Sequence, residues 1–235
     1  MEWQSDLIRR FQWSAPIVNR EAKEVVAGKI SQRAKNGDII GAGSGSTVYL
    51  ALLALAEKVR NENLHITVIP ASMESAAVCS QLNIPQTTLW NSRPDWTMDG
   101  ADEIDFAGNL LKGRGGAMFK EKLLIRSSSL VYILADETKF VRRLGEKFPV
   151  PVEVFPGALT YAEEQLRKLG AARIELRPAQ GKDGPVISEN GNLILDAWFH
   201  SIGYDLERKI KEITGVFESG LFIDYRVQIL TTEKE

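Results

Sequence analysis

Cysteine and histidine are scarce in this chain of 235 residues, which contains one cysteine, Cys79, and two histidines, His65 and His200. A single cysteine excludes an internal disulfide and any metal site built from several cysteines. Two histidines far apart in the sequence argue against a histidine-based metal centre. Cys79 lies among apolar residues, which is typical of a small core side chain rather than of a nucleophile. We therefore expect no metal, and a reducing cytoplasm as the location.

An excess of charge of one sign and long hydrophobic runs are also absent. The chain has 29 lysines and arginines against 31 aspartates and glutamates, a net charge of −2, and the two signs are interspersed. Nothing in this pattern indicates binding to nucleic acid or to an anionic membrane. No apolar run approaches the ~20 residues that span a bilayer, and the N-terminal segment does not have the pattern of a secretory signal. The partners we expect therefore include neither nucleic acid nor membrane.

What is present suits a soluble protein with a sizeable core, because 44% of the residues are hydrophobic. In the first part of the chain, strands expected at 38–40, 65–69, 96–98 and 131–135 alternate with helices expected at 19–34, 48–60, 76–82 and 117–127. This alternation predicts a parallel α/β sheet. Residues 1–20, with Trp3, Phe11 and Trp13, are interpreted as a short amphipathic helix or an arm packing on the body or on another subunit.

After a plausible linker at 148–151, the pattern changes. Strands are expected at 150–155, 172–176, 186–188, 193–199 and 216–223, and helices at 161–169 and 204–213. Asn190-Gly191 is a strong signal for a hairpin turn between two of these strands. Apart from the short hairpin strand at 186–188, these elements have the order β-α-β-β-α-β, which predicts a ferredoxin-like α+β unit. A short strand at 227–230 can return to the first sheet.

The segment Gly41-Ala42-Gly43-Ser44-Gly45-Ser46-Thr47 follows the first strand and precedes a helix. Glycines allow close approach of the backbone, the N–H groups of a helix start point at an anion, and the hydroxyl groups of Ser44, Ser46 and Thr47 add donors. The segment is neither a Walker A sequence nor GxGxxG, because its spacing is GxGxG without a following lysine. We interpret it as a phosphate-binding loop, with an unliganded glycine-rich turn as the alternative.

The segment from Asp99 to Lys122, DGADEIDFAGNLLKGRGGAMFKEK, combines many charges with many glycines. It begins just after the strand at 96–98, so it and the phosphate-type loop both lie at carboxyl ends of strands, where open parallel sheets bind ligands. On the helix at 117–127, Glu121 shares a face with Met118, Leu124 and Ile125. Such a carboxylate would have a raised pKa suited to a proton-transfer base, whereas a solvated glutamate at a helix start is the alternative. Asp136-Glu137-Thr138-Lys139 adds another polar cluster at a strand end.

These motifs together resemble ribose-5-phosphate isomerase type A. The resemblance lies in Gly43 to Thr47, in Asp99-Gly100-Ala101-Asp102-Glu103, in Lys112-Gly113-Arg114-Gly115-Gly116 followed by Glu121, and in Asp136 to Lys139. It continues through Pro151 to Pro156, Asn190-Gly191-Asn192 and Gly215 to Phe222. It covers roughly residues 21–223 with order and spacing preserved. Arg114 stands where a glycine is often found in that family.

The resemblance implies an α/β fold. Its Rossmann-like, mostly parallel sheet domain would span residues 1–147 plus 222–235, and a smaller inserted α+β (ferredoxin-like) domain would span 148–221. It implies an aldose–ketose isomerase of the non-oxidative pentose phosphate pathway that interconverts D-ribose 5-phosphate and D-ribulose 5-phosphate through a cis-enediolate. No cofactor and no metal are expected. The expected partner is a small sugar phosphate, and the expected assembly is a homodimer or homotetramer.

The resemblance also implies roles for individual residues. Glu121 would be the base, Lys112 would stabilise the enediolate oxyanion, and Asp99 would assist ring opening and proton movement. Ser44, Gly45, Ser46 and Thr47 would hold the phosphate, with charge from Lys23 and Lys139. The residues expected to position the rest of the sugar are Asp99, Gly100, Ala101, Asp102, Lys112, Gly113, Arg114 and Gly115.

Two alternatives keep the fold and change the function. One is a related sugar-phosphate isomerase, deaminase or lactonase, which would be expected to lack the Asp99–Glu103 block together with Lys112 and Glu121. The other is a non-catalytic sugar-phosphate sensor, against which the intact Glu121 and the lack of a basic DNA-binding stripe both argue.

Overall fold

The computed structural model describes residues 6–13, 16–181 and 183–233, so Trp3 of the predicted N-terminal arm lies outside the described residues. The chain forms two compact units. Unit 1 comprises residues 1–100, 123–138 and 227–235, and unit 2 comprises residues 101–122 and 139–226. The smaller domain expected at 148–221 lies within unit 2, which also includes residues 101–122, 139–147 and 222–226.

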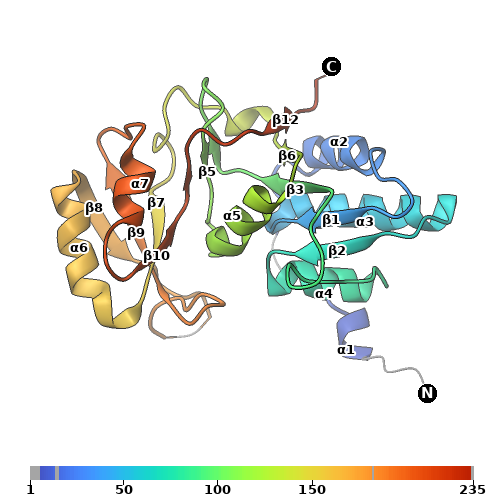
Figure 1. Ribbon diagram of the computed structural model, residues 1–235, viewed down its shortest axis with the longest axis horizontal. Coiled ribbons are helices and arrows are strands. Elements are labelled where there is room, and N and C mark those ends of the chain that lie inside the picture. The colour runs from blue at the N-terminus through green and yellow to red at the C-terminus, as the bar shows by residue number, and fades with distance from the viewer. Residues whose placement is uncertain (1–5, 14–15, 182, 234–235) are drawn as a thin grey trace. The chain divides into compact units, whose positions relative to one another are not determined.

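Unit 1 is built on a five-stranded sheet in the order β12-β6-β3-β1-β2. Its strands are β1 (Ile39–Ala42), β2 (Thr67–Pro70), β3 (Trp96–Gly100), β6 (Val131–Leu134) and β12 (Gln228–Leu230). Every neighbouring pair is parallel. The predicted parallel α/β sheet is therefore confirmed, and so is the return of the last strand, which pairs with β6 (Figure 1).

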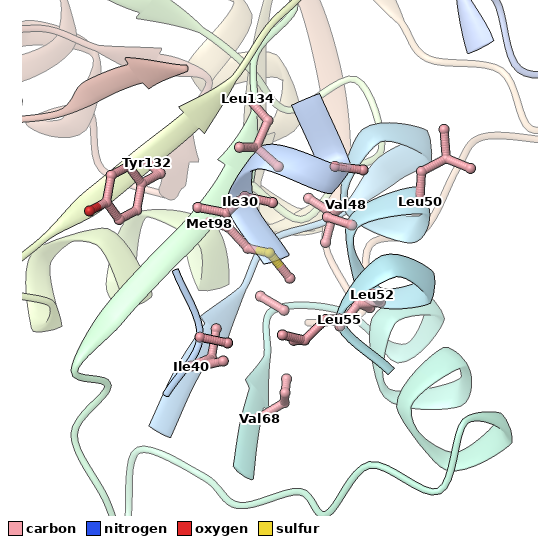
Figure 2. Close-up of a cluster of buried hydrophobic side chains, with 14 of the residues drawn as sticks. Ile30, Ile40, Val48, Leu50, Leu52, Leu55, Val68, Met98, Tyr132 and Leu134 are labelled. Atoms are coloured by element: carbon pink, nitrogen blue, oxygen red, sulfur yellow. The ribbon is translucent and has the colours of Figure 1, made fainter. Parts of the chain in front are cut away.

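Side chains on the two faces of this sheet alternate along each strand, as the pleat requires. Ile40 and Val68 belong to the main core, which also contains Ile30 and Leu52 (Figure 2). That core joins helices α2 (Arg20–Ser31), α3 (Gly45–Glu62) and α4 (Met73–Gln81). Ile39 and Ile69 pack instead with Leu124 of helix α5 (Met118–Ser127). The sheet of unit 1 thus has apolar contacts on both faces, as in doubly wound folds.

The N-terminal segment and Cys79 both belong to the apolar packing of unit 1. Helix α1 (Asp6–Arg9) is followed by Phe11, which packs against the main core, and the ring of Trp13 stacks on Tyr49 with 5.1 Å between centroids. Cys79 is fully buried in the same core, and burial raises the pKa of its thiol to about 12. The interpretation of Cys79 as a core residue is confirmed.

The main part of unit 2 is an antiparallel sheet in the order β10-β7-β9-β8. Its elements are, in chain order, β7 (Val150–Val154), α6 (Leu159–Lys168), β8 (Ala171–Leu176), β9 (Leu193–Phe199), α7 (Leu206–Lys211) and β10 (Val216–Ser219). The predicted order β-α-β-β-α-β is confirmed, and the strand arrangement is ferredoxin-like. The linker expected at 148–151 is partly strand, because Val150 and Pro151 already pair with β9.

The two faces of this sheet have different neighbours. Val150, Val152 and Val154 point into the core shared with α6 and α7, and Leu195 joins them from β9. The alternating positions, Pro151 and Glu153 on β7 and Ile194 and Asp196 on β9, therefore lie on the opposite face. On that opposite face, Pro151 and Ile194 lie next to Gly113 and Gly116 of the loop after β5.

A third, small sheet in unit 2 has the order β11-β5-β4. It consists of β4 (Glu103–Ile104), β5 (Leu110–Leu111) and β11 (Leu221–Phe222). The single strand predicted at 216–223 is therefore wrong, because β10 and β11 pair in different sheets. The break falls at Gly220, where a Cβ atom would lie 2.1 Å from the carbonyl oxygen of Lys112.

Two further predictions differ from the structure. Helix α3 begins at Gly45 rather than at Val48, because Ser44 is still extended with a φ of −132° and the helix follows at once. The strand predicted at 186–188 is reduced to a single bridge between Ile187 and Leu193. The turn itself is confirmed, with Gly191 at a φ of +77°. In the described part of the chain, no helix is both long and apolar enough to cross a membrane.

Candidate active site

The predicted site residues fall into both units. Unit 1 holds Lys23, Ser44, Gly45, Ser46, Thr47, Asp99 and Gly100. Unit 2 holds Ala101, Asp102, Lys112, Gly113, Arg114, Gly115, Glu121 and Lys139. The chain joins the two groups directly, since Gly100 of β3 is followed by Ala101. Each group is described by itself below.

The phosphate-type loop of unit 1 is shorter than the sequence suggested. Strand β1 ends at Ala42, Ser44 is the N-cap, and Gly45, Ser46 and Thr47 form the first turn of α3. Backbone N–H groups of a first turn have no partner within the helix and carry the positive end of its dipole. The side chain of Lys23, 7% exposed, donates from Nζ to Ser46 Oγ at 3.0 Å. The helix start thus combines amide, hydroxyl and ammonium donors, a combination suited to a phosphate.

Gly41 of strand β1 and Gly43 of this loop make room for the neighbouring strand β3. A Cβ atom at Gly41 would lie 2.0 Å from Thr97 Oγ1, and one at Gly43 would lie 2.0 Å from Asp99 Oδ1. Gly45 has a different requirement, because its φ is +85°. The glycine at position 43 therefore allows the Asp99 carboxylate to lie directly against the loop. The spacing of the glycines in the sequence did not indicate this role.

Asp99 is fully buried as the penultimate residue of β3. Its Oδ1 accepts hydrogen bonds from the backbone N–H of Gly100 at 2.7 Å and from that of Ser44 at 3.4 Å. The sequence placed Asp99 just beyond the strand, whereas the strand in fact includes it. A buried carboxylate is thereby fixed beside the start of α3.

Asp136 lies at the carboxyl end of β6, on the same edge of the parallel sheet as Asp99. It is buried and accepts from the backbone N–H of Thr138 at 3.0 Å, and the hydroxyl group of Thr138 also donates to it. The side chain of Asn19, a residue with a φ of +54°, donates to Asp136 Oδ1 at 3.3 Å. The polar edge that the sequence predicted is confirmed within unit 1, and Asp136 ties the segment before α2 to it.

The central feature of unit 2 is a buried ion pair between Lys112 and Glu121. Lys112 Nζ lies 3.4 Å from Glu121 Oε2, and the side chains are 4% and 3% exposed. The backbone N–H of Lys112 donates to Gly220 O at 2.8 Å, which fixes the residue at the end of β5. The prediction that Glu121 lies on the apolar face of its helix is confirmed, because Met118 and Leu124 are also buried.

Asp102 also belongs to unit 2, and the pKa of its carboxyl group is raised above the usual value for aspartate. Burial is the main cause, opposed by the positive charges of Lys112 and Lys139. The negative charge of Glu121 raises the pKa of Asp102 further, and a hydrogen bond from the backbone N–H of Arg114 at 3.3 Å lowers it. These influences show that Asp102, Lys112, Glu121 and Lys139 share one electrostatic environment within unit 2.

The loop from Gly113 to Gly116 connects β5 to α5. Gly113 and Gly116 have φ values of +92° and +81°, so the loop requires glycine at both ends. Arg114 is exposed, and its guanidinium lies over the ring of Phe148 with 5.2 Å to the centroid. The Arg114 side chain is thus held against the protein surface.

Sequence reasoning missed one residue at this loop, Arg177. Its Nη1 donates to the carbonyl oxygens of Gly113 at 3.1 Å and Arg114 at 2.9 Å, while the rest of the guanidinium binds Asp196. An arginine more than 60 residues away leaves no signal in local patterns.

Lys122 and Glu103 have structural roles. The ammonium group of Lys122 is 2.8 Å from Glu207 and 2.8 Å from Glu218, and it also donates to the carbonyl oxygens of Ser219 and Leu221. The Lys122 side chain is buried, so its charge serves the structure of unit 2. Glu103, fully buried, accepts from three backbone N–H groups between Gly145 and Phe148. Among the residues that the structure describes, no group of three or more His, Cys, Asp or Glu side chains could hold a metal ion.

Comparison with known proteins defines the class. The family model of ribose 5-phosphate isomerase A (phosphoriboisomerase A) matches residues 67–235. The ribose-5-phosphate isomerase A of Archaeoglobus fulgidus is 42% identical over 192 residues, covering 80% of this chain and 84% of that protein. The structure of ribose 5-phosphate isomerase A from Methanocaldococcus jannaschii aligns with a TM-score of 0.88 at 37% identity, covering 92% of this chain and 96% of that one.

A second solved structure, a D-ribose-5-phosphate isomerase in complex with phospho-erythronic acid, aligns with a TM-score of 0.86 at 36% identity. It covers 90% of this chain and 94% of that chain. The fold and the matches first define an α/β sugar-phosphate isomerase. More particularly, the chain belongs to the ribose 5-phosphate isomerase A family. It is accordingly an enzyme with ribose-5-phosphate isomerase activity, which belongs to the pentose phosphate pathway.

Proposed function

We propose that Glu121 is the base that carries a proton between C2 and C1 as D-ribose 5-phosphate and D-ribulose 5-phosphate interconvert through a cis-enediolate. The observation that carries this proposal is the pair of buried charges, Lys112 Nζ and Glu121 Oε2, at 3.4 Å. A carboxylate excluded from water and held beside a cation is suited to abstract a proton from carbon, because the cation can then stabilise the oxyanion that forms.

The charges balance through the step. Glu121 removes the proton from C2 of the open-chain aldose and becomes neutral, while the electron pair of the broken C–H bond moves onto the oxygen at C1. Lys112 interacts with a carboxylate before the step and with an enediolate oxyanion after it. Glu121 then returns the proton to C1, and the hydroxyl proton of O2 moves to O1 to complete the ketose. Such oxyanion stabilisation can be worth about 3 kcal/mol in a dry site.

The same proposal assigns the substrate contacts. Ser44, Gly45, Ser46 and Thr47 bind the phosphate at the start of α3, with Lys23 and Lys139 supplying positive charge; Lys23 already donates to Ser46 at 3.0 Å. Asp99 assists ring opening and proton movement between the sugar oxygens. The groups that position the sugar hydroxyls are Asp102 and the backbone of Gly100, Ala101 and Gly113 to Gly115. Support comes from the buried state of Asp99 and from the shared electrostatic environment of Asp102 and Lys112.

The test is Glu121→Gln, which keeps the shape of the side chain and removes the base. Isomerisation should fall by about a thousandfold, within the range for loss of a general base, while calorimetry still detects ribose 5-phosphate binding. Glu164→Gln, at an exposed carboxylate paired with Lys168, is the matched control and should retain full activity. Full activity in Glu121→Gln would remove Glu121 from the role of base.

The assembly and the location belong to the same proposal. We propose a homodimer or homotetramer in the cytoplasm, supported by the sequence resemblance and by the single, fully buried Cys79. Light scattering after size-exclusion chromatography measures the assembly directly, and a monomer at micromolar concentration would contradict that part of the proposal.

A further inference from the structure

The loop from Gly113 to Gly116 rests on the face of the β7–β9 sheet opposite α6 and α7. A Cβ atom at Gly113 would meet Pro151 at 3.4 Å, and one at Gly116 would meet Ile194 at 3.0 Å. Pro151 and Ile194 are positions of β7 and β9 that face away from the helical core. All these residues belong to unit 2. The loop therefore packs against the β7–β9 sheet of its own unit.

Arg177 binds this loop to the sheet with its whole guanidinium group. One edge, Nε and Nη2, forms a two-pronged ion pair with the carboxylate of Asp196 on β9, at 2.9 and 2.5 Å. Nη1 donates to the carbonyl oxygens of Gly113 and Arg114, at 3.1 and 2.9 Å. Both side chains of the ion pair are only 15% exposed. Such a planar, two-edged arrangement needs arginine, because a lysine ammonium group cannot reproduce its geometry.

These two hydrogen bonds determine where the loop amides point. In a trans peptide the carbonyl and the N–H group lie on opposite sides, and no described peptide bond is cis. Because the carbonyls of Gly113 and Arg114 face Arg177, the N–H groups of Arg114 and Gly115 face away from it. The N–H of Arg114 does reach Asp102 Oδ2, at 3.3 Å. Successive amides directed to one side form a small site for negatively charged or hydroxyl oxygens.

We propose that Arg177, held by Asp196, is a positioning residue that orients the Arg114 and Gly115 amides, and with them Asp102, toward the sugar hydroxyls of the substrate. The inference rests on the proposed function, in which these groups contact the sugar. Arg177 itself touches no reacting atom. Its loss should weaken the binding of the sugar portion and leave the phosphate loop of unit 1 unaffected.

The experiment measures kcat and KM for ribose 5-phosphate, and the inhibition constant of inorganic phosphate, in Arg177→Ala and Arg177→Lys. We expect KM to rise about tenfold or more in both variants, since two hydrogen bonds from a charged donor are lost, with a smaller fall in kcat. The inhibition constant of inorganic phosphate should stay within about twofold, because the α3 helix start that binds it in the proposal is intact. If Arg177→Lys has a normal KM, the planar, two-edged guanidinium group is not required and the inference is wrong.

Arg177→Ala leaves the carboxylate of Asp196, only 15% exposed, without its partner, so the variant can fail to fold. The double variant Arg177→Ala/Asp196→Ala removes both charges and keeps the test valid. Its KM should match that of Arg177→Ala, because Asp196 acts only through Arg177 and the two effects are not additive. Asp196→Ala alone should raise KM to a value between those of the wild type and Arg177→Ala.

Arg173→Ala is the matched control, because Arg173 lies on β8 of the same unit in an exposed pair with Glu175. It should change neither KM nor kcat. If Arg177→Ala lowers the unfolding temperature but leaves KM unchanged, the residue is merely structural and the proposal fails.

The outcomes separate this inference from the assignment of Glu121. Full activity in Glu121→Gln combined with a raised KM in Arg177→Ala would contradict the base and keep the positioning role. Loss of activity in Glu121→Gln with a normal KM in Arg177→Ala would support Glu121 as the base and contradict the positioning role of Arg177.

Discussion

Two buried lysines of unit 2, Lys122 and Lys112, differ in the distances to their carboxylate partners. Lys122 has two carboxylates at 2.8 Å and two carbonyl oxygens at 2.9 and 3.1 Å, which satisfies an ammonium group with three donors. Lys112 lies 3.4 Å from Glu121, longer than the ~2.8 Å of a strong charge-assisted hydrogen bond. We interpret the first as an anchor and the second as a pair that can change partners during a reaction.

Asp102 is a carboxylate whose ionisation the fold opposes, and a substitution can reveal this. Its pKa is raised in the folded state, so the ionised form costs stability above that pKa, and the cost vanishes below the usual value of about 3.9. Asp102→Asn should therefore be more stable than the wild type at about pH 7, with the gain fading as the pH falls. Its KM for ribose 5-phosphate should rise about tenfold, as expected for a lost charged hydrogen bond.

Thermal unfolding across pH and steady-state kinetics measure the two effects. The matched substitution Asp205→Asn should show the opposite sign, because the Lys209 side chain lowers the pKa of Asp205 and the ionised form is favoured in the folded state. A stability loss in Asp102→Asn at neutral pH would contradict the interpretation of Asp102 as a desolvated group.

At the scale of elements, the turn from β1 into α3 depends on contact with β3. Gly43 has no positive φ, so its requirement is steric and comes from Asp99, whose Oδ1 would lie 2.0 Å from an added Cβ. The same contact brings the buried carboxylate next to the helix start. The loop and the carboxylate are therefore one structural element, although 55 residues separate Ser44 from Asp99.

Gly43→Ala should consequently impair both stability and activity. The added methyl group displaces Asp99 or the loop, at a cost of about 1–3 kcal/mol in unfolding free energy. The kcat should fall because the proposed mechanism uses Asp99 for ring opening and proton movement. Urea unfolding and the isomerase assay measure the two effects.

Gly28→Ala, in helix α2 where an added Cβ meets nothing within 4 Å, is the control. It should be neutral or stabilising by about 1 kcal/mol with unchanged kinetics. Equal behaviour of the two variants would show that the Gly43–Asp99 contact is unimportant.

At the scale of the whole molecule, the chain passes between the two units at residues 100/101, 122/123, 138/139 and 226/227. Lys122 is the last residue of unit 2 before the passage at 122/123. It joins α5 to Glu207 of α7 and to Glu218 of β10. Glu207 also accepts from the backbone N–H of Ile223 and from the hydroxyl group of Tyr225. One buried cation therefore holds several segments of unit 2 together.

Lys122→Met should lower the unfolding free energy by about 3–5 kcal/mol, because it removes the buried cation that Glu207 and Glu218 share. Of these two, only Glu218 then keeps a second ion pair within the described residues, with Lys211 at 3.4 Å. Lys120→Met, on the same helix in a more exposed pair with Glu189, should cost less than about 1 kcal/mol. Chemical denaturation compares the two. Equal losses would contradict the anchoring role of Lys122.

The effect of Lys122→Met also has a predictable pH dependence. Burial alone would raise the pKa of Glu218, but attraction to Lys122, its hydrogen bond and the N–H of Ser219 outweigh burial and lower the pKa. The stability from this pair is therefore present above the usual glutamate value of about 4.3 and lost as the pH falls through the lowered pKa. The difference in unfolding free energy between the wild type and Lys122→Met should therefore become smaller at acid pH.

Much of this protein can be predicted from local patterns in its sequence. Helical spacing alone placed Glu121 on the apolar face of α5, and the β-α-β-β-α-β order and the turn at Asn190-Gly191 followed from periodicity and turn chemistry. The position of Ser44 to Thr47 at a helix start followed from glycine and hydroxyl residues between a strand and a helix. These features depend on neighbours within a few residues, which is why they can be read before folding is known.

Other features depend on residues that only the folded chain brings together. Arg177 reaches a loop 63 and 64 residues earlier, and Lys122 reaches carboxylates 85 and 96 residues later. The break at Gly220 and the need for glycine at position 43 arise from a carbonyl of Lys112 and a carboxylate of Asp99. The sequence by itself determined most of the elements, the family resemblance and the candidate residues in the local motifs. The tertiary structure decided which charges are anchors and which side of the Gly113–Gly116 loop its amides face, because burial and partner geometry exist only after distant strands have paired.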